Sequence, residues 1–148
     1  GLYSLHISHQ LSTTMAYFPK SKTDKWATPP KIYDPLHEEF QFNYDPCPIT
    51  WEEGDADGLT SEWGTSTFCN PPYSKTALWI AKCHEEWKKG KTIVLLMNAT
   101  TDTKAFHQYI NGQAEVRFVK GRISFIKQGE TKHAPNVRPS IIVVFHKV

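Results

Sequence analysis

The chain has 148 residues and a mass of 17.0 kDa, a length that suits one domain, and its 39% hydrophobic and 13% aromatic residues exclude a fully disordered chain. The longest apolar run, residues 93–97, is too short to cross a membrane, and three cysteines without CxxC spacing argue against a disulfide scaffold or a cysteine-rich zinc site and indicate a reducing, intracellular compartment. The formal net charge of +2 is unevenly distributed: residues 1–73 carry 4 Lys and Arg against 10 Asp and Glu, whereas residues 74–148 carry 13 against 5.

The opposite charges of the two halves indicate different partners. A positive surface attracts a polyanion such as nucleic acid, and an acidic pocket suits a cationic cofactor or a metal ion. The same asymmetry also fits two solvated faces that differ by chance, so the charge pattern alone leaves the function open.

The first 14 residues lack the charged start and the apolar core of a signal peptide. We expect residues 1–23 to be a leader or an extended arm, and residues 24–148 to form a single domain. At the start of this domain, Pro29 and Pro30 predict a helix at residues 31–40, in which Pro35 predicts a kink or a later start.

A short strand and an acidic loop follow this helix. Residues 41–45 alternate polar and aromatic side chains, and we expect them to form a strand that ends in Asp-Pro. The loop at residues 46–63 contains Trp51 and Trp63, which either stack on bases or anchor the loop to the core.

The next strand and helix surround a proline-rich motif. The strand is predicted at residues 65–69 and stops at Asn70-Pro71-Pro72. We expect Ser74 to cap a helix at residues 75–89 and Gly90 to end it.

The second half of the chain contains the most apolar predicted strand, at residues 92–97. We expect four further elements: a helix at residues 102–110 and short strands at residues 114–120, 123–127 and 141–146, with a polar loop around Pro135 before the last strand. This order predicts an α/β fold with a mainly parallel sheet and an antiparallel end.

Polar residues follow three of the predicted strands. Asp45 ends the first strand, Asn70 ends the second, and residues 98–101 follow the third. Because ligands in such sheets bind at the carboxyl ends of the strands, we expect the functional site at this edge.

The motif Asn70-Pro71-Pro72-Tyr73 carries the chemistry that we expect there. The two prolines have a fixed φ and no backbone N–H, so the turn is rigid and its carbonyls stay free. The Asn70 amide oxygen and the Pro71 carbonyl can accept the two hydrogens of an exocyclic amine, and the Tyr73 ring can stack on the attached base. The alternative is a strand-ending loop in which Asn70 caps the next helix.

Several motifs occur in the order and spacing of one enzyme family. They are Asp24-Lys25-Trp26-Ala27-Thr28-Pro29-Pro30, Asp45-Pro46-Cys47, Asp57-Gly58-Leu59, Phe68-Cys69-Asn70-Pro71-Pro72-Tyr73-Ser74 and Lys120-Gly121-Arg122-Ile123-Ser124-Phe125. On these motifs the chain resembles the phage-type, Dam-like DNA N6-adenine methyltransferases. The resemblance implies a compact Rossmann-like sheet, S-adenosylmethionine as cofactor, and DNA with a flipped adenine as substrate. It also implies a cytoplasmic enzyme of a phage or prophage in a bacterial host, acting with no membrane, no metal and no covalent intermediate.

The resemblance assigns roles to individual residues. The catalytic positions correspond to Asn70, Pro71, Pro72 and Tyr73. The cofactor positions correspond to Trp26, Thr28 and Pro29 at the methionine end, Asp45 near the amino-acid and ribose portion, Asp57 near the adenine, and Cys47 in the motif of Asp45. Lys120 and Arg122 are candidates for contact with DNA phosphates, on their charge as well as on the resemblance. Arg138 is a further candidate because it lies in a polar loop near the predicted edge, where the alternative is a solvated side chain.

The chain departs from larger methyltransferases between the first strand and Asn70. The segment Asp45-Pro46-Cys47-Pro48 replaces a glycine-rich loop, and about 25 positions separate it from Asn70. We expect the sheet to be shortened here, with Glu52, Glu53 or Asp55 in place of the acidic residue that grips the cofactor ribose. Two other functions remain open from the sequence: methylation of another planar amine, in RNA adenine or protein glutamine, and non-catalytic nucleic-acid binding.

Overall fold

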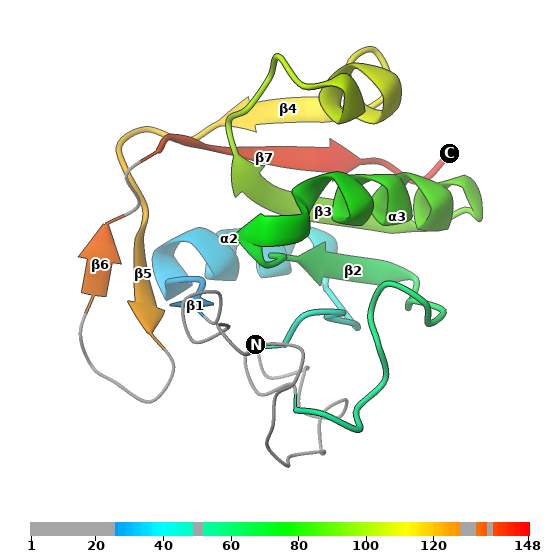
Figure 1. Ribbon diagram of the computed structural model, residues 1–148, viewed down its shortest axis with the longest axis horizontal. Coiled ribbons are helices and arrows are strands. Elements are labelled where there is room, and N and C mark those ends of the chain that lie inside the picture. Colours follow the sequence, from blue (N-terminus) through cyan, green and yellow to red (C-terminus); the bar gives the residue numbers. More distant parts are fainter. Residues whose placement is uncertain (1–25, 49–51, 128–132, 136–137) are drawn as a thin grey trace.

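The computed structural model describes residues 26–48, 52–127, 133–135 and 138–148 (Figure 1). Its helices are α2 (Pro30–Phe40), the 3₁₀ helix η2 (Tyr73–Lys75), α3 (Thr76–Lys88) and the π-helix η3 (Phe106–Ile110). Its strands are β1 (Trp26–Ala27), β2 (Ser66–Cys69), β3 (Thr92–Asn98), β4 (Glu115–Phe118), β5 (Ser124–Lys127), β6 (His133–Pro135) and β7 (Ser140–Phe145). The expected leader at residues 1–23 and the expectation for Trp51 lie outside the described residues. In the described part of the chain, no helix is long and apolar enough to span a membrane.

Four strands form the main sheet in the order β2-β3-β7-β4, and β1, β5 and β6 form a second, antiparallel sheet. β2 runs parallel to β3, and β7 runs antiparallel to both β3 and β4. As a result β2, β3 and β4 all end at the same edge of the main sheet, and β7 begins there (Figure 1). We call this edge the carboxyl edge.

The main sheet is mixed, so the expectation of a mainly parallel sheet is wrong. Among the described strands, β2 and β3 form the one parallel pair, because β7 lies between β3 and β4. The predicted strand at residues 41–45 contributes a single parallel bridge, between Tyr44 and Thr67. Pro46 and Pro48 follow at once and cannot donate ladder hydrogen bonds, which ends the pairing. The expected antiparallel end is confirmed by β7.

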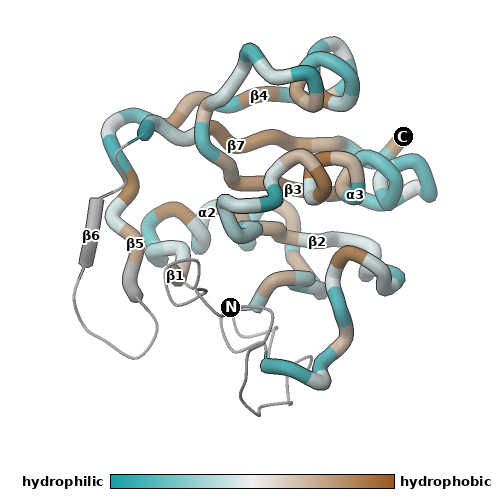
Figure 2. Tube along the Cα trace, in the orientation of Figure 1, coloured by the Kyte–Doolittle hydropathy of each residue, from teal (hydrophilic) through white to brown (hydrophobic). Residues whose placement is uncertain are grey.

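A helix covers each face of the central strands. Ile93, Leu95 and Met97 of β3 pack in one core cluster with Trp79, Ile80 and Cys83 of α3, and Val94 and Leu96 pack in the other with Tyr33 and Leu36 of α2. Because both faces are buried, β3 and β7 are nearly continuous apolar runs (Figure 2). The predicted buried strand at residues 92–97 is confirmed.

α2 begins at Pro30 with Pro29 at the N-cap, as the proline pair predicts. The helix runs through Pro35, so the expected later start is wrong. A proline inside a helix costs about 3 kcal/mol. Burial of Tyr33 and Leu36 offsets this cost, since a large apolar side chain contributes roughly 1.5–3 kcal/mol when it is buried.

α3 follows the Asn-Pro-Pro-Tyr motif as predicted, but it begins differently. Ser74 is not its cap: Lys75 holds the N-cap position, without a side-chain cap hydrogen bond. The chain first turns through η2, where Thr76 Oγ1 donates a 3.0 Å hydrogen bond to the Tyr73 carbonyl. Gly90, with a φ of 96°, follows the helix end as predicted.

The remaining predictions are confirmed in part. The helix expected at residues 102–110 is the π-helix η3, in which the Asn111 N–H donates to the Phe106 carbonyl, five residues back. The strands expected at 114–120, 123–127 and 141–146 correspond to β4, β5 and β7. The polar loop expected around Pro135 contains the strand β6, which pairs with β5.

Candidate active site

The carboxyl edge brings together segments from four strands. Asn70 directly follows β2, residues 99–101 follow β3, and residues 119–122 follow β4. Pro139 leads into β7, and its carbonyl accepts a 2.8 Å hydrogen bond from the Ala99 N–H. The predicted meeting of strand ends at one edge is therefore confirmed.

The side chain of Asn70 is held by Thr28. The Asn70 Nδ2–H donates to Thr28 Oγ1 over 2.8 Å, which joins the segment before α2 to the segment after β2. Because the nitrogen of this amide donates to Thr28, its oxygen Oδ1 lies on the other side as an acceptor. The alternative in which Asn70 caps the next helix is wrong, since Pro72 and Lys75 are the N-caps of η2 and α3.

The residues after Asn70 form a fixed turn. Pro71 and Pro72 are buried, and the φ of Pro72 is −60°. Tyr73 opens η2 and is 39% exposed, so part of its ring reaches the surface beside Asn70. The expected acceptors, at Asn70 and Pro71, and the expected stacking ring of Tyr73 therefore lie within four consecutive residues of one rigid turn.

Asp45 and Cys47 lie beside the end of β2. The Tyr44 carbonyl accepts a 3.1 Å hydrogen bond from the Phe68 N–H, so Asp45 follows alongside the last residue of β2. Asp45 Oδ1 accepts the Cys47 N–H over 2.9 Å, and Cys47 Sγ is 3.9 Å from Cys69 Sγ. Both residues are thus neighbours of the strand that ends at the candidate catalytic turn.

Asp57 reaches the same region through a close backbone contact at Gly58. A Cβ added to Gly58 would lie 2.4 Å from the Pro46 carbonyl oxygen and 2.8 Å from the Trp79 ring, so a larger residue would push the loop away. The two acidic motifs expected to bind the cofactor, around Asp45 and around Asp57, are therefore in direct contact.

The negative charge of this region affects the pKa of the Cys47 thiol. Burial raises the pKa of the Cys47 thiol to about 11, and the nearby carboxylates of Asp45 and Asp57 also act to raise it. Burial likewise raises the pKa of Cys69 and Cys83 well above the usual range. All three thiols stay protonated at neutral pH and serve as apolar packing groups.

Two stacked indoles support the loop that carries Asp57. The rings of Trp63 and Trp79 have centroids 6.4 Å apart, and Trp63 Nε1 donates a 2.7 Å hydrogen bond to the Gly58 carbonyl. Of the two roles open for Trp63, the structure gives it the anchoring one. Trp79 is 2% exposed, and its Nε1–H has no hydrogen-bond partner among the described residues. A buried donor of this kind costs about 1–3 kcal/mol unless a ligand or water pairs with it.

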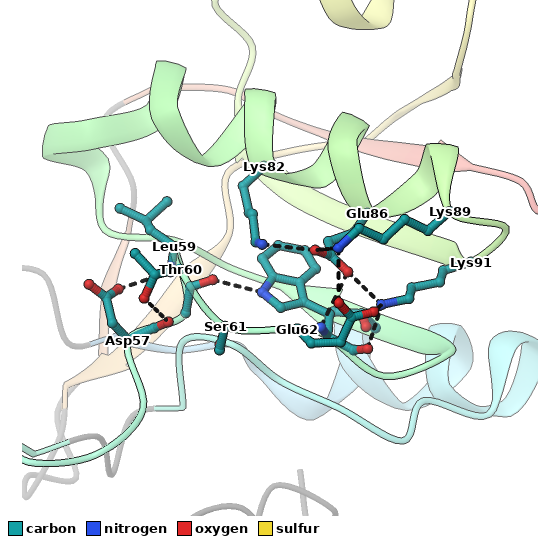
Figure 3. Close-up of polar contacts among 12 residues, drawn as sticks. Asp57, Leu59, Thr60, Ser61, Glu62, Lys82, Glu86, Lys89 and Lys91 are labelled. Carbon is teal, nitrogen blue, oxygen red and sulfur yellow. Dashed lines mark hydrogen bonds and ion pairs between the residues drawn. The ribbon is translucent and has the colours of Figure 1, made fainter.

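A buried ion cluster fixes the other end of this loop (Figure 3). Glu86 of α3 is 0% exposed and accepts hydrogen bonds from the ammonium groups of Lys82, Lys89 and Lys91. Burial raises the pKa of the Glu86 carboxyl, but these hydrogen bonds outweigh it and lower the pKa to about 2. Glu86 is therefore ionised at any pH near neutrality.

The cluster holds the loop through the backbone of Trp63. The Trp63 N–H donates to Glu86 Oε1 at 3.2 Å, and its carbonyl accepts a 2.6 Å hydrogen bond from Lys91. Glu62 accepts hydrogen bonds from Lys89 and Lys91 at the surface of the cluster. Residues 57–63 are thus tied down at both ends, which fixes the position of Asp57.

The expected phosphate-binding residues are exposed at the carboxyl edge. Lys120 and Arg122 lie in the connection between β4 and β5, and Arg138 lies just before β7. Three strand spacings of about 4.8 Å separate β2 from β4, so Lys120 lies roughly 14 Å across the sheet from the strand that leads to Asn70. Lys120 is therefore on the same edge of the sheet as Asn70 but at its other side.

The chain is similar to proteins of known activity. A family model for DNA N-6-adenine-methyltransferase (Dam) matches residues 15–148. The DNA N-6-adenine-methyltransferase of Haemophilus phage HP1 is 27% identical over 140 residues, which cover 85% of this chain and 80% of that protein. No solved structure matches the chain. The family match includes every residue described above at the carboxyl edge.

Proposed function

The chain belongs to the Dam family of DNA N-6-adenine-methyltransferases, and we propose that it receives its target adenine at the turn from Asn70 to Tyr73. Members of this family transfer a methyl group from S-adenosylmethionine to N6 of adenine in DNA, and so does this chain. This membership decides against RNA adenine, protein glutamine and a non-catalytic role. The proposal is carried by the hydrogen bond from Asn70 to Thr28, because it orients an amide oxygen at the carboxyl edge.

The residues around Asp45 and Asp57 suit the cofactor. S-adenosylmethionine carries a sulfonium and an ammonium, whose positive charges carboxylates stabilise. It also carries hydroxyl groups, from which carboxylates accept hydrogen bonds. The buried Trp79 Nε1–H offers a donor to an acceptor atom of the cofactor. We therefore assign cofactor contacts to the expected residues Trp26, Thr28, Pro29, Asp45, Cys47 and Asp57.

The turn activates the amine without a strong base. Adenine N6 is a poor nucleophile because its lone pair is delocalised into the ring, and the bound cofactor supplies an electrophilic methyl group. Asn70 Oδ1 and the Pro71 carbonyl accept the two N–H groups, which favours a tetrahedral nitrogen with a directed lone pair. The proton leaves after methyl transfer, when the nitrogen is positively charged and acidic. Pro72 keeps the two acceptors in place, because its ring fixes the backbone.

The target nitrogen lies inside duplex DNA, so the adenine has to leave the base stack. Tyr73 lies two residues after the Pro71 acceptor and is partly exposed, which suits stacking on the flipped base. Lys120, Arg122 and Arg138 lie on the same edge, where they contact backbone phosphates and fix the register of the duplex.

We infer that the main sheet is a shortened Rossmann-like methyltransferase sheet. β2, β3 and β4 share one direction, helices cover both faces, and the candidate site lies at the carboxyl edge. We also infer that the enzyme acts in the cytoplasm of a bacterial host and is encoded by a phage or prophage. The phage relative and the three free thiols, Cys47, Cys69 and Cys83, support this inference.

Asn70→Ala tests the proposed catalytic role. The protein is incubated with labelled S-adenosylmethionine and unmethylated DNA, and N6-methyladenine is measured in the digested DNA. We expect Asn70→Ala to lower methyl transfer by about 100-fold or more, with cofactor affinity in calorimetry unchanged within a few-fold. Asn111→Ala, an exposed asparagine after η3, is the matched control. Lost cofactor binding with normal turnover of the bound cofactor would contradict the assignment.

A further inference from the structure

Phe118, the last residue of β4, is 84% exposed at the carboxyl edge. In the sheet it pairs with Ile141 of β7, which pairs with Met97 near the end of β3. A single exposed apolar side chain is common and on its own carries no functional meaning. Two features give Phe118 a functional meaning: the cationic residues near it, and its position along the strand direction, which is close to that of Asn70.

Arg117 fixes the end of β4 from the opposite face. Its guanidinium donates to both carboxylate oxygens of Glu39, at 2.7 and 2.8 Å, and its Nε donates to Glu115 at 2.9 Å. The same group lies 5.4 Å from the centre of the Phe40 ring. Since side chains alternate along a strand, Phe118 projects to the other face of the sheet, away from α2. A strand end held in this way presents Phe118 on a rigid support.

Two of the candidate phosphate-binding residues follow Phe118 within four positions. Lys120 and Arg122 are both exposed, and Arg138 lies before β7, the strand that pairs with β4. In protein–DNA interfaces cations fix the backbone, while aromatic side chains contact the bases. An exposed phenyl ring among these cations therefore matches a DNA surface better than an apolar protein surface.

Phe118 is also nearly level with Asn70. One row of register partners crosses the whole sheet: Cys69, Leu95, Val143 and Val116. Asn70 lies one residue beyond this row and Phe118 lies two residues beyond it, so their levels differ by about 3.3 Å. Across the sheet they are roughly 14 Å apart, similar to the major groove width of about 12 Å.

We propose that Phe118 is a wedge that enters the base stack of the duplex beside the flipped adenine. The inference rests on the proposed function, because it requires the target adenine at Asn70. A flipped base leaves its neighbours unstacked, and an inserted apolar side chain restores stacking contacts and keeps the step open. Asn70 then holds the extruded adenine, while Phe118 contacts the duplex that the adenine has left.

The test compares two duplexes that differ in the cost of flipping. The target sequence is first read by sequencing DNA methylated by the wild-type protein, and a short duplex is then made with the target adenine opposite thymine or opposite an abasic site. We expect Phe118→Ala to lower kcat/KM at least about tenfold on the paired duplex and less than about threefold on the abasic one, because an unpaired adenine flips more easily. Phe118→Trp keeps an aromatic wedge and should remain active on both duplexes.

Val148→Ala is the matched control, because it truncates an apolar side chain that is 85% exposed at the C-terminus. It should leave both rates unchanged. Equal losses for Phe118→Ala on the two duplexes, or no loss on either, would overturn the wedge. The two proposals fail separately: a wild-type protein that methylates no DNA overturns the proposed function, whereas an active wild type with an unaffected Phe118→Ala overturns only this inference.

Discussion

Asn70 Nδ2 donates a 2.8 Å hydrogen bond to Thr28 Oγ1, and this contact couples the start of α2 to the end of β2. Without an acceptor at Thr28, the Asn70 amide is free to rotate. Its nitrogen can then face the adenine amine in place of the oxygen Oδ1, which has to accept a hydrogen bond from that amine. Thr28 is therefore a positioning residue for the proposed reaction, in addition to its expected place beside the cofactor.

Thr28→Val tests this coupling, because valine keeps the shape of threonine and removes the acceptor. We expect kcat to fall by about fivefold, since a hydrogen bond contributes about 1 kcal/mol and 1.36 kcal/mol corresponds to a factor of ten. Thr28→Ser, which keeps the hydroxyl, should retain most of the wild-type kcat. Steady-state kinetics at saturating DNA make the measurement, and a change confined to the KM for the cofactor would restrict Thr28 to a binding role.

Asp45→Ala and Asp57→Ala should each weaken S-adenosylmethionine binding, because each removes a carboxylate from the region beside Cys47. Hydrogen bonds to charged groups contribute about 1.5–3 kcal/mol, so the dissociation constant should rise by about tenfold or more. Isothermal calorimetry gives this value directly. Asp34→Ala, which removes an exposed carboxylate from α2, is the control. Unchanged affinity in both test variants would remove this region from the cofactor site.

Trp79→Phe separates packing from hydrogen bonding, because phenylalanine keeps an aromatic ring and removes the unpaired Nε1–H. If this donor pairs with the cofactor, the variant binds S-adenosylmethionine more weakly, and its melting temperature rises less on cofactor addition than that of the wild type. Trp63→Phe is the matched comparison, since it removes a donor that already pairs with the Gly58 carbonyl. That variant should lose stability with or without cofactor. A full thermal shift in Trp79→Phe would contradict the pairing.

The sequence predicted the parts of the fold that depend on local chemistry. The apolar run that became β3, the proline pair before α2 and the glycine after α3 each act through their own backbone or burial preference. The strand expected at residues 41–45 was reduced to one bridge because two prolines follow it. Ser74 did not become a cap, because the buried Pro71 and Pro72 direct the chain into a 3₁₀ turn first.

Long-range arrangements do not follow from local sequence patterns. The position of β7 between β3 and β4 depends on pairing across the whole sheet, which no local pattern encodes. The ion cluster was missed for the same reason: Lys82 and Glu86 have the spacing of an exposed helical pair, and only burial with Lys91 and Trp63 makes them part of the site. The edge location of Asn70, in contrast, followed from strand order alone.

The lowered pKa of the Glu86 carboxyl predicts that the protein loses stability in acid. Burial raises its pKa, but hydrogen bonds from Lys82, Lys91 and Lys89 lower it from the ordinary value of 4.5 to about 2. A carboxyl with a depressed pKa contributes stability above its unfolded pKa and loses it as the pH falls through the folded one. Urea denaturation should therefore show a falling free energy of unfolding between about pH 4.5 and pH 2.

Glu86→Gln should make this pH dependence shallower and should also destabilise the protein at pH 7 by about 3–5 kcal/mol, because it leaves buried ammonium groups without their carboxylate. Glu85→Gln, an exposed neighbour on α3, is the control and should keep the wild-type pH profile. Identical acid profiles for wild type and Glu86→Gln would show that the cluster is not the source of the acid sensitivity.

Changing Lys120, Arg122 and Arg138 together to Ala tests the predicted DNA backbone contacts. Each phosphate contact releases counterions, so the loss of three contacts should reduce the slope of log affinity against log salt by roughly 2.7 and weaken binding to any DNA sequence. Cofactor affinity should stay the same, because these side chains lie across the sheet from Asp45 and Asp57.

A double variant of Lys88 and Lys147 is the control. Both side chains are exposed, Lys88 at the end of α3 and Lys147 after the end of β7, at the edge of the sheet opposite the carboxyl edge. Their replacement by Ala removes positive charge without removing phosphate contacts and should keep the slope. Equal changes in the two variants would mean that net charge, rather than the carboxyl edge, attracts the DNA, and an unchanged slope in the triple variant would place the backbone contacts elsewhere.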